Sequence, residues 1–353
     1  FRPKESKAYE LLIEGDDGYR VYVNGEKVID YWGEHASAKR DYTLKATAGT
    51  DYKIRIEYMQ AGAEALLRFD LGIYRHISPE MVVNRIKEAD IVIFAGGISP
   101  SLEGEEMYSV NSPGFAGGDR TSIELPQVQR DILKALKKAG KKVVFVNCSG
   151  SAVALVPEIE SCDAILQAWY PGQSGGLAVA DVLFGDFNPS GKLPVTFYKN
   201  TDQLPDFEDY SMKNRTYRYM TEAPLFPFGY GLSYTTFDIS KGRLNKKTIS
   251  AGQDLNFKVN VKNTGKYDGA EVIQVYVRKV DDAEGPIKSL RAFRRVPLKA
   301  GETCVVSIDL LPTTFEFFDP TTNTMRIMPG KYEIMYGNSS DIPSGNKLSV
   351  TLR

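Results

Sequence analysis

The hydrophobic periodicity of the chain changes twice, and these changes constrain its fold more than any other feature. Residues 7–72, and the residues from Asp238 onward, alternate apolar and polar side chains, which is typical of antiparallel strands with one buried face. Between them, from about residue 80, runs of β-branched residues alternate with helical patterns, as in a parallel sheet covered by helices on both faces. The sequence therefore predicts a multi-domain chain with an α/β middle and all-β ends.

We expect four regions along the chain. Part of an antiparallel β-sandwich module spans 1–75, and an αβα sandwich with a mostly parallel sheet spans 76–210. A linker rich in Pro, Gly and aromatic residues spans 211–237, and we expect its rings to pack over a surface. A fibronectin type III-like β-sandwich spans 238–353 and shows no catalytic constellation.

Two turn signals mark the first region. Asn24 and Gly25 separate two alternating runs, which predicts a β-hairpin. Asp16 and Asp17 precede a glycine, and they could either shape a turn or contact a sugar. The residue types alone leave both roles open.

The middle region alternates strands with helices. In sheets of this kind the functional loops leave the C-terminal ends of the strands. The sequence predicts strands at 90–97, 141–150 and 163–170, and helices at 79–90, 125–140 and 174–185.

An acidic segment follows the first of these strands. It places Glu103, Glu105 and Glu106 within four positions. Carboxylates this close raise one another's pKa, and a carboxyl with a raised pKa can act as a general acid near neutral pH. A solvated acidic loop is the alternative, but the position after a strand end favours a functional role.

The composition argues against several classes of function. The net charge is -1, from 44 basic and 45 acidic residues, so neither nucleic acid nor an anionic membrane is an expected partner. No apolar run is long enough to span a membrane. The three cysteines lack metal-ligand spacing, and the two histidines lie far from the glutamates in the sequence. We therefore expect no metal, no cofactor and no histidine-based nucleophile.

Three further motifs have structural and functional interpretations. Gly96 and Gly97 lack the third glycine of a nucleotide loop, so we interpret them as a strand exit that lets the backbone approach a ligand. Ser149 and Ser151 lack the pattern of a hydrolase elbow, and a helix-capping role is favoured. An ion pair between Asp119 and its neighbour Arg120 would fix the loop before the next helix.

Several long stretches resemble the C-terminal half of glycoside hydrolase family 3, the retaining β-glucosidases and β-xylosidases, over residues 80–353. The segment EGDDGYRVYVNGEKVIDYW resembles the protective-antigen-type β-module that glycosidases carry as an insert. The family stretches are GGDRTSIELPQVQRDILKAL, VVFVNCSGSAVAL, AILQAWYPGQSGGLAVADVLFGDFNPSGKLPVTFY and FPFGYGLSYTTF.

The resemblance implies an active site shared between two domains. In the family, an N-terminal TIM-type barrel supplies an Asp nucleophile, and a loop of the αβα sandwich supplies the acid/base Glu. The chain contains no barrel, so it resembles the C-terminal part of a longer enzyme. Counting from the strand favours Glu105 as the acid/base, whereas the Glu-Gly pair favours Glu103, and Glu106 would be a neighbour that contacts the substrate and raises the pKa of the acid. Trp169 and Tyr170 would line the face toward barrel and substrate, although a core role for Trp169 is equally compatible.

The expected partners are an oligosaccharide substrate and the barrel domain of the same enzyme, and a homodimer stays open. The long insert between Glu103 and the Gly-Asp-Arg segment resembles bacterial β-xylosidases, so terminal β-D-xylosyl residues are the first predicted substrate and glucosyl residues the second. A periplasmic or secreted bacterial location is compatible with such an enzyme. The alternative from another class is a non-catalytic carbohydrate-binding or structural module, and nucleotide binding is disfavoured because no glycine fingerprint is present.

Overall fold

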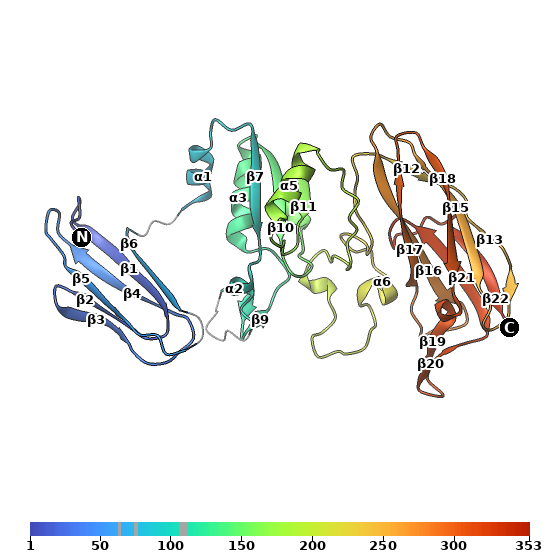
Figure 1. The fold of residues 1–353 in the computed structure, drawn as a ribbon, viewed down its shortest axis with the longest axis horizontal. Helices are drawn as coiled ribbons and strands as arrows, with labels where there is room; N and C mark the ends of the chain where they lie inside the picture. The colour runs from blue at the N-terminus through green and yellow to red at the C-terminus, as the bar shows by residue number, and fades with distance from the viewer. Residues whose placement is uncertain (63–64, 74–76, 106–111) are drawn as a thin grey trace. The chain divides into compact units, whose positions relative to one another are not determined.

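A computed structural model describes residues 1–62, 65–73, 77–105 and 112–353, and Figure 1 traces them along the chain. The chain divides into two compact units, Phe1–Ser78 and Pro79–Arg353. The sequence places this boundary at 75. No helix in the described ranges is both long and apolar enough to cross a membrane.

Two antiparallel sheets of three strands form the first unit, with orders β4-β1-β6 and β3-β2-β5. Leu11 of β1 and Val21 of β2 are completely buried, because every second residue of these strands faces the core between the sheets. The strands are β1 Lys7–Asp16, β2 Tyr19–Val23, β3 Glu26–Tyr31, β4 Ala38–Ala46, β5 Ile54–Tyr58 and β6 Leu66–Gly72.

The predicted hairpin is confirmed, and Asp17 has a structural role. Asn24 and Gly25 both have positive φ, at 52° and 90°, as a two-residue turn between β2 and β3 requires. The Asp17 carboxylate is buried and accepts the backbone N–H groups of His35 at 2.9 Å and Ala61 at 2.7 Å. The hydrogen bond from Ala61, followed by that from His35, lowers the pKa of Asp17. Of the two roles left open by the sequence, the structure favours turn shaping for Asp17.

A three-stranded parallel sheet with the order β11-β10-β7 forms the centre of the second unit's α/β part. Its elements follow the predicted alternation, although α1 is shorter than the predicted helix and the short helix α2 was not predicted. They are α1 Pro79–Arg85, β7 Ile91–Gly97, α2 Pro100–Glu103, β8 Phe115–Ala116, β9 Asp119–Arg120, α3 Gln127–Lys138, β10 Lys142–Cys148, α4 Val156–Ser161, β11 Ala164–Gln167, α5 Gly175–Phe184, the 3-10 helix Thr201–Gln203 and α6 Thr216–Tyr219.

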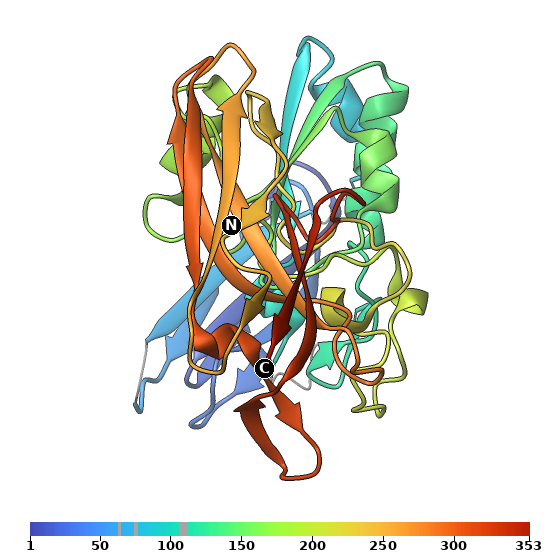
Figure 2. The ribbon, with the colours of Figure 1, turned by 90° about the vertical axis from the view of Figure 1, so that its right-hand side faces the viewer.

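The two faces of this sheet are covered unequally. Figures 1 and 2 show α3 on one side of the sheet and α5 on the other. Toward α3, Phe145 packs with Leu133 in a buried core. On the opposite face, Ile91 and Ile93 of β7 are 59% and 50% exposed, and Phe184 of α5 is 77% exposed. Burial of both faces, which the apolar strands predict, is therefore incomplete in the described residues.

A β-sandwich follows, and its core contains alternate residues of the long central strands. One sheet has the order β12-β15-β13 with β18 also paired to β15, and the other has the order β14-β22-β21-β16-β17. The elements are β12 Phe237–Ile239, β13 Arg243–Leu244, β14 Thr248–Ile249, β15 Leu255–Asn263, β16 Gly269–Lys279, β17 Ser289–Leu298, β18 Thr303–Leu310, the 3-10 helix Pro312–Phe315, β19 Glu316–Asp319, β20 Thr324–Ile327, β21 Gly330–Gly337 and β22 Lys347–Leu352.

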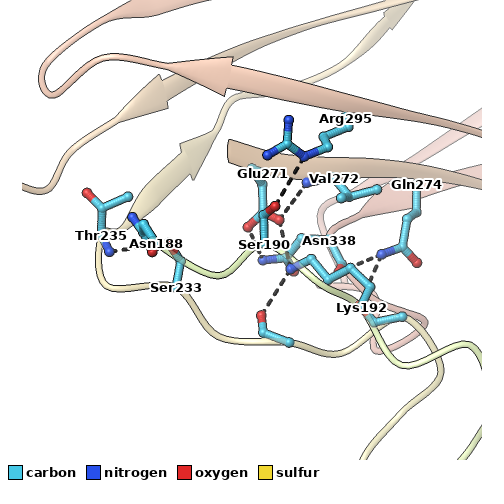
Figure 3. Close-up of polar contacts among 12 residues, drawn as sticks. Asn188, Ser190, Lys192, Ser233, Thr235, Glu271, Val272, Gln274, Arg295 and Asn338 are labelled. Atoms are coloured by element: carbon cyan, nitrogen blue, oxygen red, sulfur yellow. Dashed lines mark hydrogen bonds and ion pairs between the residues drawn. The ribbon is translucent and has the colours of Figure 1, made fainter. Parts of the chain in front are cut away.

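Polar contacts fasten the segment before the β-sandwich to its strands (Figure 3). Lys192 Nζ lies 2.8 Å from Glu271 Oε1, and both side chains are largely buried. Asn338 donates to the other oxygen of Glu271 at 2.9 Å. The expected packing of the linker rings over a surface is also present, since Tyr217 and Phe228 lie against the Tyr276 ring of β16, with centroids 5.7 and 6.5 Å apart. A buried ion pair thus joins the α/β part to the β-sandwich, and the linker packs on the sandwich through aromatic rings.

Candidate active site

The acidic loop begins where β7 ends. The Ser99 hydroxyl accepts the backbone N–H of Leu102 at 3.2 Å and so caps α2, with Pro100 at the first helical position. Gly104 ends the helix with φ 73° and donates to the Pro100 carbonyl. The Ser-Pro pair is the sequence signal from which this helix could have been predicted. Because α2 is a single turn, the contacts at its two ends fix the backbone positions of Glu103, its last residue, and of Glu105 shortly after it.

Glu103 lies at the end of α2 beside a cation and a phenol. It is partly buried. Burial raises the pKa of Tyr170, and the negative charge of Glu103 raises it further. Burial lowers the pKa of Arg120, and the charge of Glu103 is the largest effect that acts in the opposite direction. The α2 loop, hairpin β8–β9 and the residues after β11 thus meet around Glu103.

Glu105 lies in the turn after Gly104 and its side chain is exposed. Glu106, predicted as the neighbour that raises the pKa of the acid, lies outside the described residues. Of the two described glutamates, Glu103 is held by its surroundings and Glu105 faces solvent.

Arg120 ties hairpin β8–β9 to the turn after β10. It is partly buried and donates to Ser151 Oγ at 2.9 Å, to the Ala152 carbonyl at 3.3 Å and to the Ser122 carbonyl at 3.2 Å. Burial lowers the pKa of Arg120. The predicted ion pair is wrong for the described structure, because Asp119 accepts the backbone N–H of Arg120 instead. The guanidinium thus fixes the loop through neutral acceptors.

The serine turn after β10 has a role that the sequence did not predict. Ser149 is fully buried, donates to the Ser151 carbonyl at 2.9 Å and accepts from Asn147 and Gln167. The predicted helix cap is wrong, because α4 begins seven residues after Ser149 in the chain, at Val156, and Leu155 caps it without a side-chain hydrogen bond. Asn147 and Gln167 were missed, since each looks like an ordinary polar residue until the parallel pairing of β10 and β11 brings them together.

The glycine pair at the end of β7 serves packing. A Cβ on Gly97 would lie 1.9 Å from the Cys148 carbonyl oxygen, and one on Gly96 would lie 2.5 Å from Gln129 Oε1. The Gln129 amide hydrogen-bonds both backbone groups of Gly97, at 2.8 and 2.7 Å. The close approach in the structure is therefore to the neighbouring strand and to a helix side chain, and an approach to a ligand stays a prediction.

The aromatic pair after β11 is divided between the core and the site. Trp169 packs with the α/β core and lies 6.0 Å from the Phe197 ring, which favours the core role left open by the sequence over contact with substrate. Tyr170 is 41% exposed and covers Gly150, where a Cβ would lie 2.6 Å from the tyrosine ring. Of the two, Tyr170 is at the site.

Glu124 anchors the segment that follows the hairpin. It accepts from Thr201 Oγ1 at 2.6 Å and from the Thr201 backbone N–H at 3.0 Å. Burial acts to raise the pKa of Glu124, but hydrogen bonds from Ser122 and Thr201 outweigh burial and lower it to about 2. This carboxylate is thus a structural acceptor and was not predicted from the sequence.

The arrangement can supply one exposed carboxyl group, held on a loop by buried polar contacts. The described residues contain no cluster of three or more His, Cys, Asp or Glu side chains suited to a metal ion, and the three cysteines are free thiols. Neither of two hollows in the second unit is lined by Glu103 or Glu105.

Two family models match the chain. The Glycosyl hydrolase family 3 C-terminal domain matches residues 19–234, and the Fibronectin type III-like domain matches residues 271–340. The first match covers more than half of the chain and begins within the first unit, ahead of the stretch from residue 80 on which the resemblance was based.

Proteins with similar sequences and structures are β-xylosidases and β-glucosidases. A xylan 1,4-β-xylosidase of Xylanibacter ruminicola is 52% identical over all of this chain and 40% of its own length. A β-glucosidase of Bacteroides ovatus is 36% identical over 96% of this chain and 46% of its own length. The structure of a β-glucosidase from Kluyveromyces marxianus with glucose superposes with a TM-score of 0.77 at 28% identity, covering 100% of this chain and 43% of that one. The chain thus spans less than half the length of these relatives.

Proposed function

The chain belongs to glycoside hydrolase family 3, and we propose that it is the C-terminal part of a retaining exo-acting β-xylosidase. The enzyme would remove terminal β-D-xylosyl residues from xylo-oligosaccharides. The observation that carries the proposal is the contrast between the two glutamates after β7: one is held by an internal contact, and the other is exposed on the same fixed loop.

Glu105 is our choice for the general acid/base. This group must protonate the departing oxygen and later deprotonate water, so it must be free to reach the substrate. The exposed Glu105 meets this need. Glu103 is a positioning residue, since its hydrogen bond with Tyr170 and the attraction of its charge to Arg120 hold the loop in one arrangement.

The nucleophile would come from an N-terminal TIM-type barrel. Retaining hydrolysis needs a second carboxylate about 5–5.5 Å from the first, to attack the anomeric carbon. The relatives have more than half of their length outside the matched region, which is enough for such a domain. The exposed Ile91 and Ile93 support the docking of further polypeptide on the sheet.

Two half-reactions would share the acid/base. In the first, the nucleophile attacks the anomeric carbon while Glu105 gives its proton to the leaving oxygen, and a covalent xylosyl-enzyme forms. In the second, Glu105 takes a proton from water, whose oxygen attacks the same carbon and releases xylose with its configuration retained. Arg120 and Tyr170 would keep the loop in place during both steps.

Glucose is the alternative sugar, because several relatives are named β-glucosidases. Xylose has priority because the relative that is 52% identical is named a xylan 1,4-β-xylosidase.

For the first unit we propose a protective-antigen-type module with a carbohydrate-binding role that does not use Asp17 directly. A periplasmic or secreted location is also proposed, since one relative is named a periplasmic β-glucosidase.

The test compares Glu105→Gln with Glu103→Gln in the full-length enzyme. With phenyl β-xyloside, Glu105→Gln should lower kcat/KM about 100- to 10,000-fold. With 2,4-dinitrophenyl β-xyloside, formation of the xylosyl-enzyme should recover in Glu105→Gln, because that leaving group departs without a proton, and added azide should then speed turnover by replacing water. Glu103→Gln should show no such dependence on the leaving group. Wild-type rates in Glu105→Gln would overturn the assignment, and a complete lack of xylosidase and glucosidase activity in the wild type would favour the non-catalytic module.

A further inference from the structure

One of the two hollows in the second unit has the right size for a small ligand and lies away from the acidic loop. Its volume is about 550 Å³, within the range of small-molecule sites, roughly 300–1,000 Å³. It is lined by Gly185, Asp186, Asn188, Tyr234, Tyr267 and Asp268. These residues come from the end of α5, the segment before β12 and the loop between β15 and β16, so the hollow lies where the α/β part meets the β-sandwich.

Asn188 fixes the walls of this hollow, and Figure 3 shows it beside Ser233. Its side-chain oxygen accepts from Ser233 Oγ and from the Tyr234 backbone N–H, both at 2.8 Å, and its amide donates to the Asp268 carbonyl at 2.8 Å. The amide approaches closely because residue 269 is glycine, where a Cβ would lie 2.8 Å from Asn188 Nδ2. One side chain thus holds all three segments, and the hollow is preformed.

The lining offers aromatic surface and free acceptors. Tyr234 and Tyr267 are 48% and 63% exposed. The Tyr234 hydroxyl donates to the Val182 carbonyl at 2.6 Å, which orients its ring. Asp186 is exposed, and Asp268 uses one carboxylate oxygen to accept the Ala300 N–H at 2.8 Å, which leaves the other oxygen for a ligand. Exposed rings and carboxylates so close together suit a ligand with both apolar faces and hydroxyl groups.

We infer that this hollow is an accessory site for a neutral β-linked oligosaccharide. Sugar C–H faces would lie on the tyrosine rings, and sugar hydroxyls would donate to Asp186 and Asp268. An anion is disfavoured because the lining residues carry two carboxylates and no cation. A metal ion is disfavoured because the described residues contain no group of three or more ligating side chains.

The site is separate from the proposed catalytic one. α5 starts after the C-terminal end of β11 and runs back along the sheet, so Gly185 lies toward the N-terminal ends of the strands. The loop that carries Glu105 lies at their C-terminal ends. Its ligand would be a distant part of a chain, or another chain, of the polysaccharide that the enzyme attacks. The choice of xylan as the ligand rests on the proposed function.

The experiment measures retention of the full-length enzyme on native gels that contain soluble xylan. Tyr267→Ala and Asp186→Asn should each weaken retention about tenfold or more. The matched control is Phe318→Ala, an aromatic side chain that is 52% exposed on β19 of the same β-sandwich. In all variants the hydrolysis of a small aryl β-xyloside and the thermal midpoint should equal those of the wild type, which shows that the fold and the catalytic site are intact.

Three results would overturn the inference. They are absence of retention in an active wild-type enzyme, unchanged retention in both pocket variants, and equal loss in Phe318→Ala. Loss of retention with unchanged aryl xyloside hydrolysis supports it. A failure of the catalytic proposal would instead show as absent hydrolysis in the wild type, so the two outcomes are distinguishable.

Discussion

Arg120 and Ser151 join two loops of the candidate site: the Nη1 group of Arg120 donates to the Ser151 hydroxyl at 2.9 Å. Arg120 ends hairpin β8–β9, and Ser151 follows β10, so the contact spans 31 residues of sequence. Since Arg120 also lies near Glu103, the same side chain connects the acidic loop to the C-terminal edge of the sheet. The position of Glu105 thus depends on a residue that need not touch the substrate.

We therefore predict that Arg120→Lys lowers kcat about 10- to 100-fold in the full-length enzyme. A lysine keeps the charge but cannot reach Ser122, Ser151 and Ala152 together, and a loop misplaced by about 1 Å can cost roughly 100-fold. KM should change less than kcat. Asp119→Asn is the control, because its amide oxygen can still accept the Arg120 N–H. Equal losses in both variants would show that the hairpin as a whole matters, and not the guanidinium.

Local patterns gave the correct prediction for several elements whose structure is decided by neighbouring residues. The Asn24-Gly25 turn and the predicted β7 and α3 segments belong to this class. The contacts at the site were missed because they join residues far apart in sequence: Gln129 binds Gly97 across 32 positions. The serine turn was misassigned for the same reason, since Asn147 and Gln167 turn the Ser149 hydroxyl inward. The exposure of Ile91 and Ile93 on the face of β7 toward α5 was also not predicted, because an apolar strand has the same sequence pattern whether one face or both are covered.

Glu124 should make the stability of the α/β part depend on acid pH. Its pKa falls from 4.5 to about 2 on folding, so its ionised form stabilises the fold above pH 4.5 and this contribution is lost as the pH falls toward 2. Glu124→Gln should therefore unfold at lower temperature than the wild type at pH 7, and the gap should close between pH 4.5 and 2. Thermal unfolding at several pH values measures this, with the exposed Glu160→Gln as a control that shows no gap. A gap independent of pH would contradict the assignment.

The ion pair between Lys192 and Glu271 should couple the α/β part to the β-sandwich. Lys192→Met leaves the Glu271 charge buried without its cation, which we expect to cost about 3–5 kcal/mol of folding free energy. Scanning calorimetry should show a lower midpoint and a separate transition for the β-sandwich. Lys347→Met is the matched control, because its pair with Glu333 is 3.9 Å long and only partly buried, and we expect it to be worth about 0–1 kcal/mol. A single unchanged transition in Lys192→Met would refute the coupling.

The open face of β7 predicts which surface the rest of the enzyme covers. Ile91 and Ile93 are 59% and 50% exposed. Continuous apolar strands of a parallel sheet are normally buried on both faces. In the full-length enzyme, Ile93→Asp should lower the midpoint of thermal unfolding as a core substitution does, because it would bury an unpaired charge. Val305→Asp is the control, since Val305 is 60% exposed on β18 of the β-sandwich, where no further layer is expected. If both variants unfold near the wild-type temperature, the face is open in the whole enzyme, and the proposed docking of further polypeptide on this sheet is wrong.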